Sequence, residues 1–148
     1  MDHVSKRVRS KIMSTVKSKG NRTTELALGR RLWEAGLRGY RKQWPVHGKP
    51  DFAWPGLKVA VFVDGCFWHG CTRCKYLPRS HTGFWRNKIE TNRRRDRRVA
   101  NRLRRAGWAV VRIRECQVGR EFSLSRIANA LATRRRSQRR HAPQSRPK

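Results

Sequence analysis

The spacing of apolar residues along the chain predicts three helices and four strands. Apolar side chains recur every three or four residues in three segments, which we predict to be helical: from about residue 23 to the glycine at 36, over 82–106, and from Leu124 to Leu131. Short runs of β-branched and aromatic residues predict strands over 40–46, 51–54, 58–64 and 108–114. The Pro55-Gly56 pair predicts the turn before the third strand.

The third predicted strand is apolar without interruption from Val59 to Val63. A strand of this kind is typical of burial on both faces, so we expect it in the middle of the sheet. Three consecutive strands with short connections favour an antiparallel arrangement, and the long helix before the fourth favours a crossover. The pattern therefore predicts an α/β fold with a mixed sheet flanked by helices.

Two polar residues interrupt the apolar stripe of the helix predicted over 82–106. Trp85, Ile89 and Val99 lie on this stripe, and Asn92 and Asp96 lie on it or at its edge. Such residues are either hydrogen-bonded packing groups or the wall of a functional site, and the sequence leaves both open.

The net charge of the chain indicates which class of molecule it binds. The 148 residues include 38 lysines and arginines against 9 acids, a formal net charge of +29. Arginine prevails over lysine, which favours bidentate phosphate contacts and stacking on bases, so we expect a nucleic acid partner. No apolar run approaches the roughly 20 residues that span a membrane, and the N-terminus lacks the apolar region of a signal peptide, so we expect a cytoplasmic protein.

Composition divides the chain into three parts. A basic arm over 1–21 precedes a single domain over 22–133, and the length suits one modest core. The tail over 134–148 has many basic residues, two prolines and no acid, so we predict that it is disordered.

The four cysteines are spaced as a metal site. Cys66, Cys71 and Cys74 form a C-x4-C-x2-C pattern, and Cys116 follows the last predicted strand. Tetrahedral zinc is commonly bound by thiolates with the C-x2-C spacing, and cysteines in a reducing compartment are more often ligands than disulfides. We expect a structural zinc site, with two disulfides or free thiols as the alternatives.

A second group of residues suits hydrolysis. Asp51 begins one predicted strand and Asp64 ends the next, and the two ends meet if the strands are antiparallel. Paired carboxylates bind Mg²⁺, and the nearby His69 suits a general base. Each has an ordinary alternative: a turn residue for Asp51, a loop cap or ion pair for Asp64, and a metal or structural role for His69. Glu25, in the first helical turn, suits the helix dipole.

Large aromatic side chains stand near this group in strongly basic surroundings. Phe67-Trp68 precedes His69, and Phe84-Trp85 begins the long helix. Core packing is their usual role, but such rings also wedge between base pairs in kinked duplexes.

Taken together, several motifs resemble those of the very-short-patch repair (Vsr) DNA mismatch endonucleases over about residues 10–131. The residues that carry the resemblance are Pro-Asp at 50–51, Phe-Val-Asp-Gly-Cys-Phe-Trp-His-Gly-Cys at 62–71, Phe-Trp-x-x-Lys-Ile-x-x-Asn at 84–92, Arg-Asp at 95–96, and Gly-Trp with a following strand and Glu-Cys at 107–116. The resemblance implies a PD-(D/E)xK restriction-endonuclease core with a structural zinc. It also implies a monomer that hydrolyses one DNA strand, with Mg²⁺, 5′ to the thymine of a T·G mismatch left by deamination of 5-methylcytosine.

The resemblance also implies roles for single residues. Asp51 and the main-chain oxygen of Val63 would bind Mg²⁺, His69 would activate water, and Glu25 would position metal-bound water. Some family members have threonine-histidine in place of Val63-Asp64, so Asp64 either binds the metal or orients a neighbour. Members also mix histidine into the zinc shell, where this chain has cysteine throughout. The residues implied to contact DNA are the intercalating Phe67, Trp68, Trp85 and Met13, with Lys88 and Asn92 facing the mismatch.

Two other functions fit parts of the same pattern. Composition and the cysteines also suit a zinc-stabilised basic nucleic-acid-binding protein without catalysis, but the grouping of Asp51, Asp64 and His69 favours a nuclease. A nuclease acting on some other distorted DNA is the third interpretation.

Overall fold

The computed structural model of the protein describes residues 7, 10, 22–74 and 77–142, and all structural statements below concern these residues. Most of the predicted N-terminal arm, including Met13, and residues 143–148 lie outside them.

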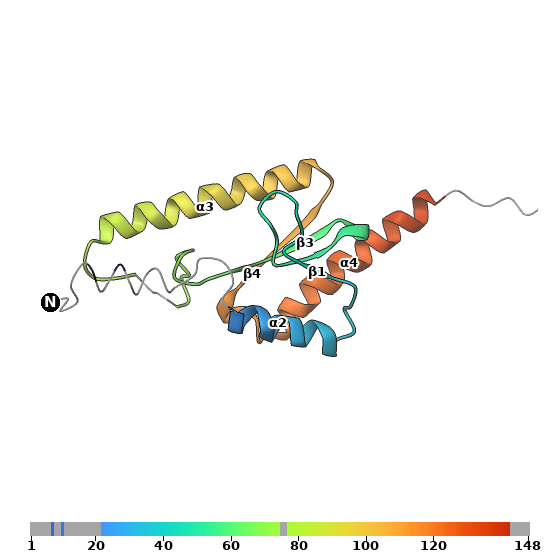
Figure 1. The fold of residues 1–148 in the computed structure, drawn as a ribbon, viewed down its shortest axis with the longest axis horizontal. Coiled ribbons are helices and arrows are strands. Elements are labelled where there is room, and N and C mark those ends of the chain that lie inside the picture. The colour runs from blue at the N-terminus through green and yellow to red at the C-terminus, as the bar shows by residue number, and fades with distance from the viewer. Residues whose placement is uncertain (1–6, 8–9, 11–21, 75–76, 143–148) are drawn as a thin grey trace, which may run out of the picture.

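The fold is a four-stranded mixed sheet with helices on both faces (Figure 1). The strands stand in chain order, with antiparallel pairing of the first three and parallel pairing of the last two. The strands are β1 (Arg41–Lys42), β2 (Phe52–Trp54), β3 (Val59–Asp64) and β4 (Ala109–Arg114). The helices are α2 (Arg22–Glu34), α3 (Thr82–Arg105) and α4 (Glu121–His141), and the 3-10 turns are η1 (Pro55–Leu57) and η2 (Glu115–Gln117). The predicted antiparallel strands, crossover and mixed sheet are confirmed.

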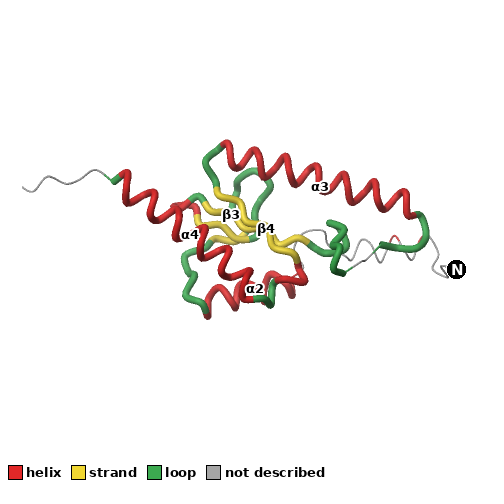
Figure 2. Tube along the Cα trace, turned by 180° about the vertical axis from the view of Figure 1, so that it is seen from behind, coloured by secondary structure: helices red, strands yellow, loops and turns green. Residues whose placement is uncertain are grey.

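Each face of the sheet carries its own core, because side chains alternate along β3. Val59 and Val61 pack with α2 and α4, whereas Ala60 and Phe62 pack with α3. Figure 2 shows α3 on one side of the sheet and α2 and α4 on the other. The prediction that this strand is buried on both faces and central in the sheet is confirmed.

The strand predicted over 40–46 is wrong for most of its length, since β1 covers only Arg41–Lys42. Gln43 has φ of 48°, in the left-handed region, which turns the chain away from the sheet. Pro45 then lacks the N–H that would continue the ladder. The turn brings the Gln43 side chain to Asp51, just before the start of β2.

The disorder predicted for the C-terminal tail is wrong for residues 134–141, which continue α4. The Gln138 amide donates a hydrogen bond to the Gly56 carbonyl at 2.5 Å and so ties this part of the helix to η1. Basic residues in the last helical turn also suit the negative end of the helix dipole.

In the described part of the chain, no helix combines the length and the apolar composition needed to cross a membrane.

Candidate active site and cysteine cluster

A cleft of about 170 Å³ opens where the end of β3 faces α3. The β2–β3 register pairs Phe52 with Val61, so Asp51, one residue before β2, comes close to the end of β3. The ionisable residues that line the cleft are Lys49, Asp51, Asp64, His69, Arg95, Asp96 and Arg112. The cleft therefore gathers three of the nine acids of a chain that is strongly basic overall.

Asp51 is held by protein donors on both carboxylate oxygens. The main-chain N–H of Val63 donates to Oδ2 at 2.7 Å and the Gln43 amide donates to Oδ1 at 3.4 Å. Burial raises the pKa of Asp51, and hydrogen bonds from Val63, from the Glu25 side chain and from Gln43 only partly oppose that rise. The Glu25 side chain from α2 therefore lies close to the Asp51 carboxyl.

His69 stands between two carboxylates. Its Nδ1 lies 2.8 Å from Asp96 Oδ2, and its Nε2 lies 3.8 Å from Asp64 Oδ1. The shorter contact places the Nδ1 proton towards Asp96 and leaves Nε2 as the ring nitrogen nearer the Asp64 side of the cleft. This is the arrangement of a histidine oriented by an acid, with one nitrogen able to accept a proton.

The loop that carries His69 is fixed by α3 through its main-chain carbonyls. Asn92 donates to the Trp68 carbonyl at 3.0 Å, and Arg93 donates to the carbonyls of His69 and Gly70 at 3.0 and 2.9 Å. These side chains come from adjacent positions on one helix, so they set the loop against α3 as a unit. The position of the imidazole therefore depends on α3.

Arg112 on β4 joins the two carboxylates that flank His69. Its Nε and Nη2 bind both oxygens of Asp64, at 2.9 and 2.5 Å, and Nη2 lies 3.3 Å from Asp96 Oδ1. Burial disfavours the ionised form of Asp96, but His69 and Arg112 outweigh burial and lower the pKa of that carboxyl. Asp64 is thus committed to an arginine fork, which fits the orienting role rather than the metal-binding one.

Beyond the end of the sheet, four aromatic rings form a cluster. Phe67 contacts Trp68 and Trp85 edge-on, with centroids 5.1 and 5.2 Å apart, and Phe84 lies 5.2 Å from Trp85. Phe84 is 62% exposed, whereas Trp85 is buried. The buried indole N–H of Trp68 has no hydrogen-bond partner among the described residues. The cluster adjoins the cleft through His69, the next residue after Trp68.

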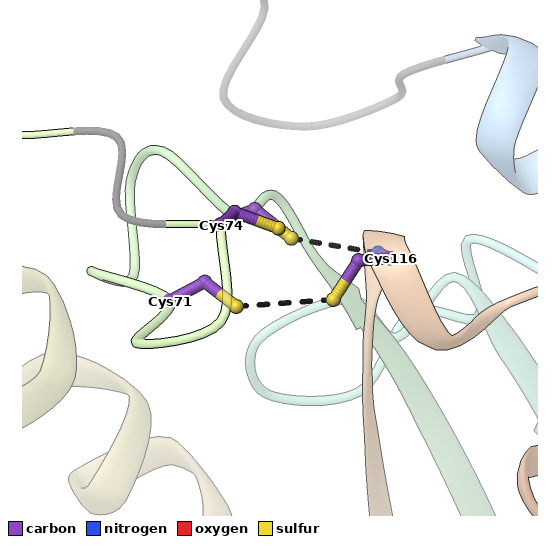
Figure 3. A group of neighbouring side chains, drawn as sticks. Cys71, Cys74 and Cys116 are labelled. Carbon is purple, nitrogen blue, oxygen red and sulfur yellow. Dashed lines mark hydrogen bonds between the residues drawn. The ribbon is translucent and has the colours of Figure 1, made fainter.

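The four cysteines come together at the end of β3 and the end of β4. All four sulfur atoms lie within 4.8 Å of one another, and those of Cys71 and Cys116 are 3.8 Å apart. Figure 3 shows the side chains of Cys71 and Cys74, from one loop, converging on Cys116 from the other segment. Four thiolates about 2.3 Å from a central zinc would be separated by about 3.8 Å, whereas a disulfide bond needs about 2.0 Å. The donor set therefore fits tetrahedral zinc, and the Cys71–Cys116 separation does not fit a disulfide.

The surroundings of Cys71 also favour a thiolate. The main-chain N–H of Cys74 and the side chain of Arg114 lower the pKa of the Cys71 thiol to about 6, although burial opposes them. Burial raises the pKa of Cys66, so a cation is needed to hold all four sulfurs as thiolates together.

Comparison with known proteins identifies the family. The family model described as DNA mismatch endonuclease Vsr matches residues 1–75. The chain is 46% identical over 114 residues to the type II nicking enzyme V.NmeDIP of Neisseria meningitidis serogroup C, which covers 76% of each chain. It is 38% identical over 133 residues to the type II nicking enzyme V.XorIIP of Xanthomonas oryzae pv. oryzae, covering 88% of this chain and 96% of the relative. It is 36% identical over 119 residues to the DNA mismatch endonuclease Vsr of Escherichia coli, covering 78% and 75%.

The chain belongs to the Vsr family. It is a DNA endonuclease, and the resemblance inferred from its motifs is confirmed.

The fold brings most of the predicted catalytic residues of this Vsr-family endonuclease together. Asp51, Val63, Asp64 and His69 line one cleft, and Glu25 reaches Asp51 from α2. A Mg²⁺ ion would suit Asp51, because a cation would offset the burial that disfavours the ionised carboxylate. The roles of these residues in catalysis stay predictions.

The predicted DNA-contacting residues lie in different environments. Phe67, Trp68 and Trp85 form the aromatic cluster, and Lys88 is exposed on α3. Asn92 is buried with its amide on the Trp68 carbonyl, so in this structure it acts as a hydrogen-bonded packing group, the first of its two predicted alternatives. Whether these residues contact DNA is a prediction that the structure does not test.

The prediction of site residues omitted Arg112, and it left Asp96 either as a packing group or as part of a site wall, with no catalytic role. The sequence could have indicated Asp96 through its position on the inward-facing stripe of the long helix. The indication for Arg112 is weaker: it is the single charged residue among the apolar positions 109–113 of a strand. A lone arginine in such a strand indicates a buried acid nearby, but it does not say which acid.

We expect Arg112→Met to slow nicking by about tenfold to a hundredfold while the Kd for DNA changes little, because Arg112 holds Asp64 away from His69 Nε2. The double variant Asp64→Asn, Arg112→Met should recover part of the activity, since the competing carboxylate is gone. Single-turnover nicking and equilibrium binding would measure both effects, with Arg98→Met, an exposed arginine of α3, as the matched control. A double variant slower than Arg112→Met would contradict this role.

We expect one zinc ion per purified chain, and Cys116→Ala should release it and destabilise the fold by about 3 kcal/mol or more, or roughly 10 °C in Tm. The physical reason is that Cys116 links β4 to the loop after β3, so metal binding becomes folding energy. Elemental analysis and thermal unfolding with and without a chelator would measure this, with Thr72→Ala in the same loop as the control. Zinc-free protein with an unchanged Tm in the variant would rule the site out.

Proposed function

We propose that this Vsr-family endonuclease nicks one strand of duplex DNA 5′ to the thymine of a T·G mismatch, by Mg²⁺-dependent hydrolysis, and so begins very short patch repair. The observation that carries the proposal is His69 held between Asp96 and Asp64 at the mouth of a cleft that also contains Asp51. Family membership supports the target, because both the family and the Escherichia coli relative are described as DNA mismatch endonucleases. We propose a monomer, in which one such cleft would cut one strand, and several relatives are described as nicking enzymes.

In the proposed reaction, the protein groups each do one task. Asp96 orients His69 through Nδ1, so that Nε2 removes a proton from the attacking water. Asp51 and the main-chain oxygen of Val63 would hold Mg²⁺, with Glu25 beside Asp51. When bound, the ion would neutralise charge that builds on the scissile phosphate. The sheet and its helices would thereby serve as the PD-(D/E)xK core, with the zinc site as a structural support.

We assign recognition of the mismatch to the aromatic cluster. Phe67, Trp68 and Trp85 pack together beyond the cleft end of the sheet, and a change in this packing would let their rings enter the duplex beside the mismatch. A mismatched step costs less to unstack than a paired one, so ring insertion distinguishes the two. The alternative of a nucleic-acid-binding protein without catalysis is disfavoured, because it would leave the cleft carboxylates and His69 without a function.

We expect Asp51→Ala and Asp51→Asn to slow Mg²⁺-dependent nicking of a T·G duplex by about a hundredfold or more, with DNA affinity nearly intact. The Asp51 carboxylate is negatively charged and does not attract phosphate. Its loss should therefore slow the chemical step and not DNA binding. Nicking of a labelled duplex with Mg²⁺ or with EDTA would measure this. Glu90→Ala, which removes an acid paired with Arg94 and Arg97 outside the cleft, is the control. Undiminished cleavage by both Asp51 variants would sink the assignment.

We expect Trp68→Ala to lower the preference for T·G over matched duplex by about tenfold, because a stacked ring contributes roughly 1 to 3 kcal/mol. The control is Trp33→Ala, which removes a tryptophan that is 57% exposed on α2, on the other side of the sheet. Competition binding at two salt concentrations would separate ring insertion from phosphate contacts. Equal weakening of both duplexes by Trp68→Ala would mean that the ring only packs.

A further inference from the structure

Two helices that are distant in sequence end at the same end of the sheet, opposite the cleft. After α3, the Ala106 carbonyl accepts a hydrogen bond from Lys58 Nζ at 3.4 Å, and the main-chain N–H of Ala109 donates to the Lys58 carbonyl at 2.8 Å. In α4, Gln138 bonds Gly56, two residues before Lys58. Figures 1 and 2 show the C-terminal ends of both helices on one side of the molecule, away from the start of α3.

The exposed side chains at this end are strongly basic. We use the name distal basic surface for six exposed residues: Lys58, Arg104, Arg105, Arg135, Arg139 and Arg140. The sequence holds no acid in 97–114 and none in 122–148. The cleft end differs in holding acids as well, because Asp51, Asp64 and Asp96 are gathered there among basic residues.

The last turns of α4 have no apolar face packed on the core, which is the contact that usually stabilises a helix in a protein. Leu131 is the last buried residue, so ten further residues, about 15 Å of helix, extend beyond the core. Along them Arg135 and Arg139 are four residues apart, as are Arg136 and Arg140, and like charges at this spacing destabilise a helix. The dipole favours basic residues only in the last turn. A polyanion bound along this segment would turn the repulsion into attraction.

We propose that the distal basic surface binds phosphates of the same duplex whose scissile phosphate occupies the cleft. This inference rests on the proposed function, which places the cut strand in the cleft. The six residues of β3 separate the two ends by about 17 Å, and the projecting part of α4 adds up to about 15 Å. At about 3.4 Å per base pair, the surface reaches phosphates roughly five to nine base pairs from the nick.

A DNA duplex fits this surface better than a lipid membrane does. Residues 132–141 contain one alanine and no larger apolar side chain, so this part of α4 has no face to insert between lipids. Arginine prevails, and its planar guanidinium binds phosphate oxygens in pairs.

The test compares two triple variants that remove the same charge. Arg135→Gln, Arg139→Gln, Arg140→Gln changes the distal basic surface, and Arg30→Gln, Arg38→Gln, Arg120→Gln changes exposed arginines elsewhere. Binding is measured in EDTA to a 10-base-pair T·G hairpin, which extends about 17 Å either side of the mismatch, and to a 30-base-pair duplex, which extends about 50 Å. Circular dichroism checks that both variants keep the fold.

We expect the unmodified enzyme to bind the longer duplex at least about tenfold more tightly than the hairpin. The distal variant should retain little of this preference for length while binding the hairpin normally, and the control variant should retain it in full. For the longer duplex, the slope of log K against log salt concentration should become shallower by about 0.9 for each phosphate that the distal variant no longer neutralises. A distal variant that keeps the preference, or a control that is weakened equally, would overturn the proposal.

The experiment separates this inference from the proposed function. Binding is read without Mg²⁺, so the length effect does not depend on cleavage. If the unmodified enzyme failed to nick the T·G duplex but showed the length effect, the binding of distant phosphates would stand and only the proposed target would fail.

Discussion

Three hydrogen bonds from α3 to consecutive main-chain carbonyls fix the segment on which the candidate active site depends. Asn92 and Arg93 hold the carbonyls of Trp68, His69 and Gly70, so one rigid helix sets the imidazole and an aromatic ring at once. The cysteine cluster holds the same loop from its other side, through Cys66 and Cys71. The proposed role of His69, to accept a proton from water, needs support of this kind, because small displacements are costly in rate.

Charge is distributed unevenly over the molecule. The cleft gathers three acids that would repel one another, and Arg112 pairs with two of them, Asp64 and Asp96. The chain as a whole is strongly basic, and this charge favours a polyanion such as DNA at its surface. A chain with a net charge of +29 can keep a carboxylate-rich cleft, because basic side chains that line the cleft offset the repulsion between the acids.

Asp64 shows how a charged residue at the end of a strand is accommodated beside His69. Both of its oxygens are bound by an arginine from the neighbouring strand. The β3–β4 register pairs Asp64 with Arg114 and Phe62 with Arg112, so Arg112 reaches Asp64 from two positions along the ladder and lies over the Phe62 ring. The ion pair keeps the charge near His69 balanced.

The sequence by itself determined the elements whose pattern is local. The unbroken apolar run from Val59 to Val63 identified the central strand, the stripe through Trp85 and Ile89 identified α3, and the four cysteines identified one cluster, because periodicity and spacing record conformation and chemistry directly. Only the tertiary structure decided that Arg112 meets Asp64 across 48 residues, that Asn92 serves the Trp68 carbonyl, and that α4 continues to His141. These outcomes depend on which segments the sheet brings side by side, and a partner supplied from a distant segment leaves no periodic trace in the chain.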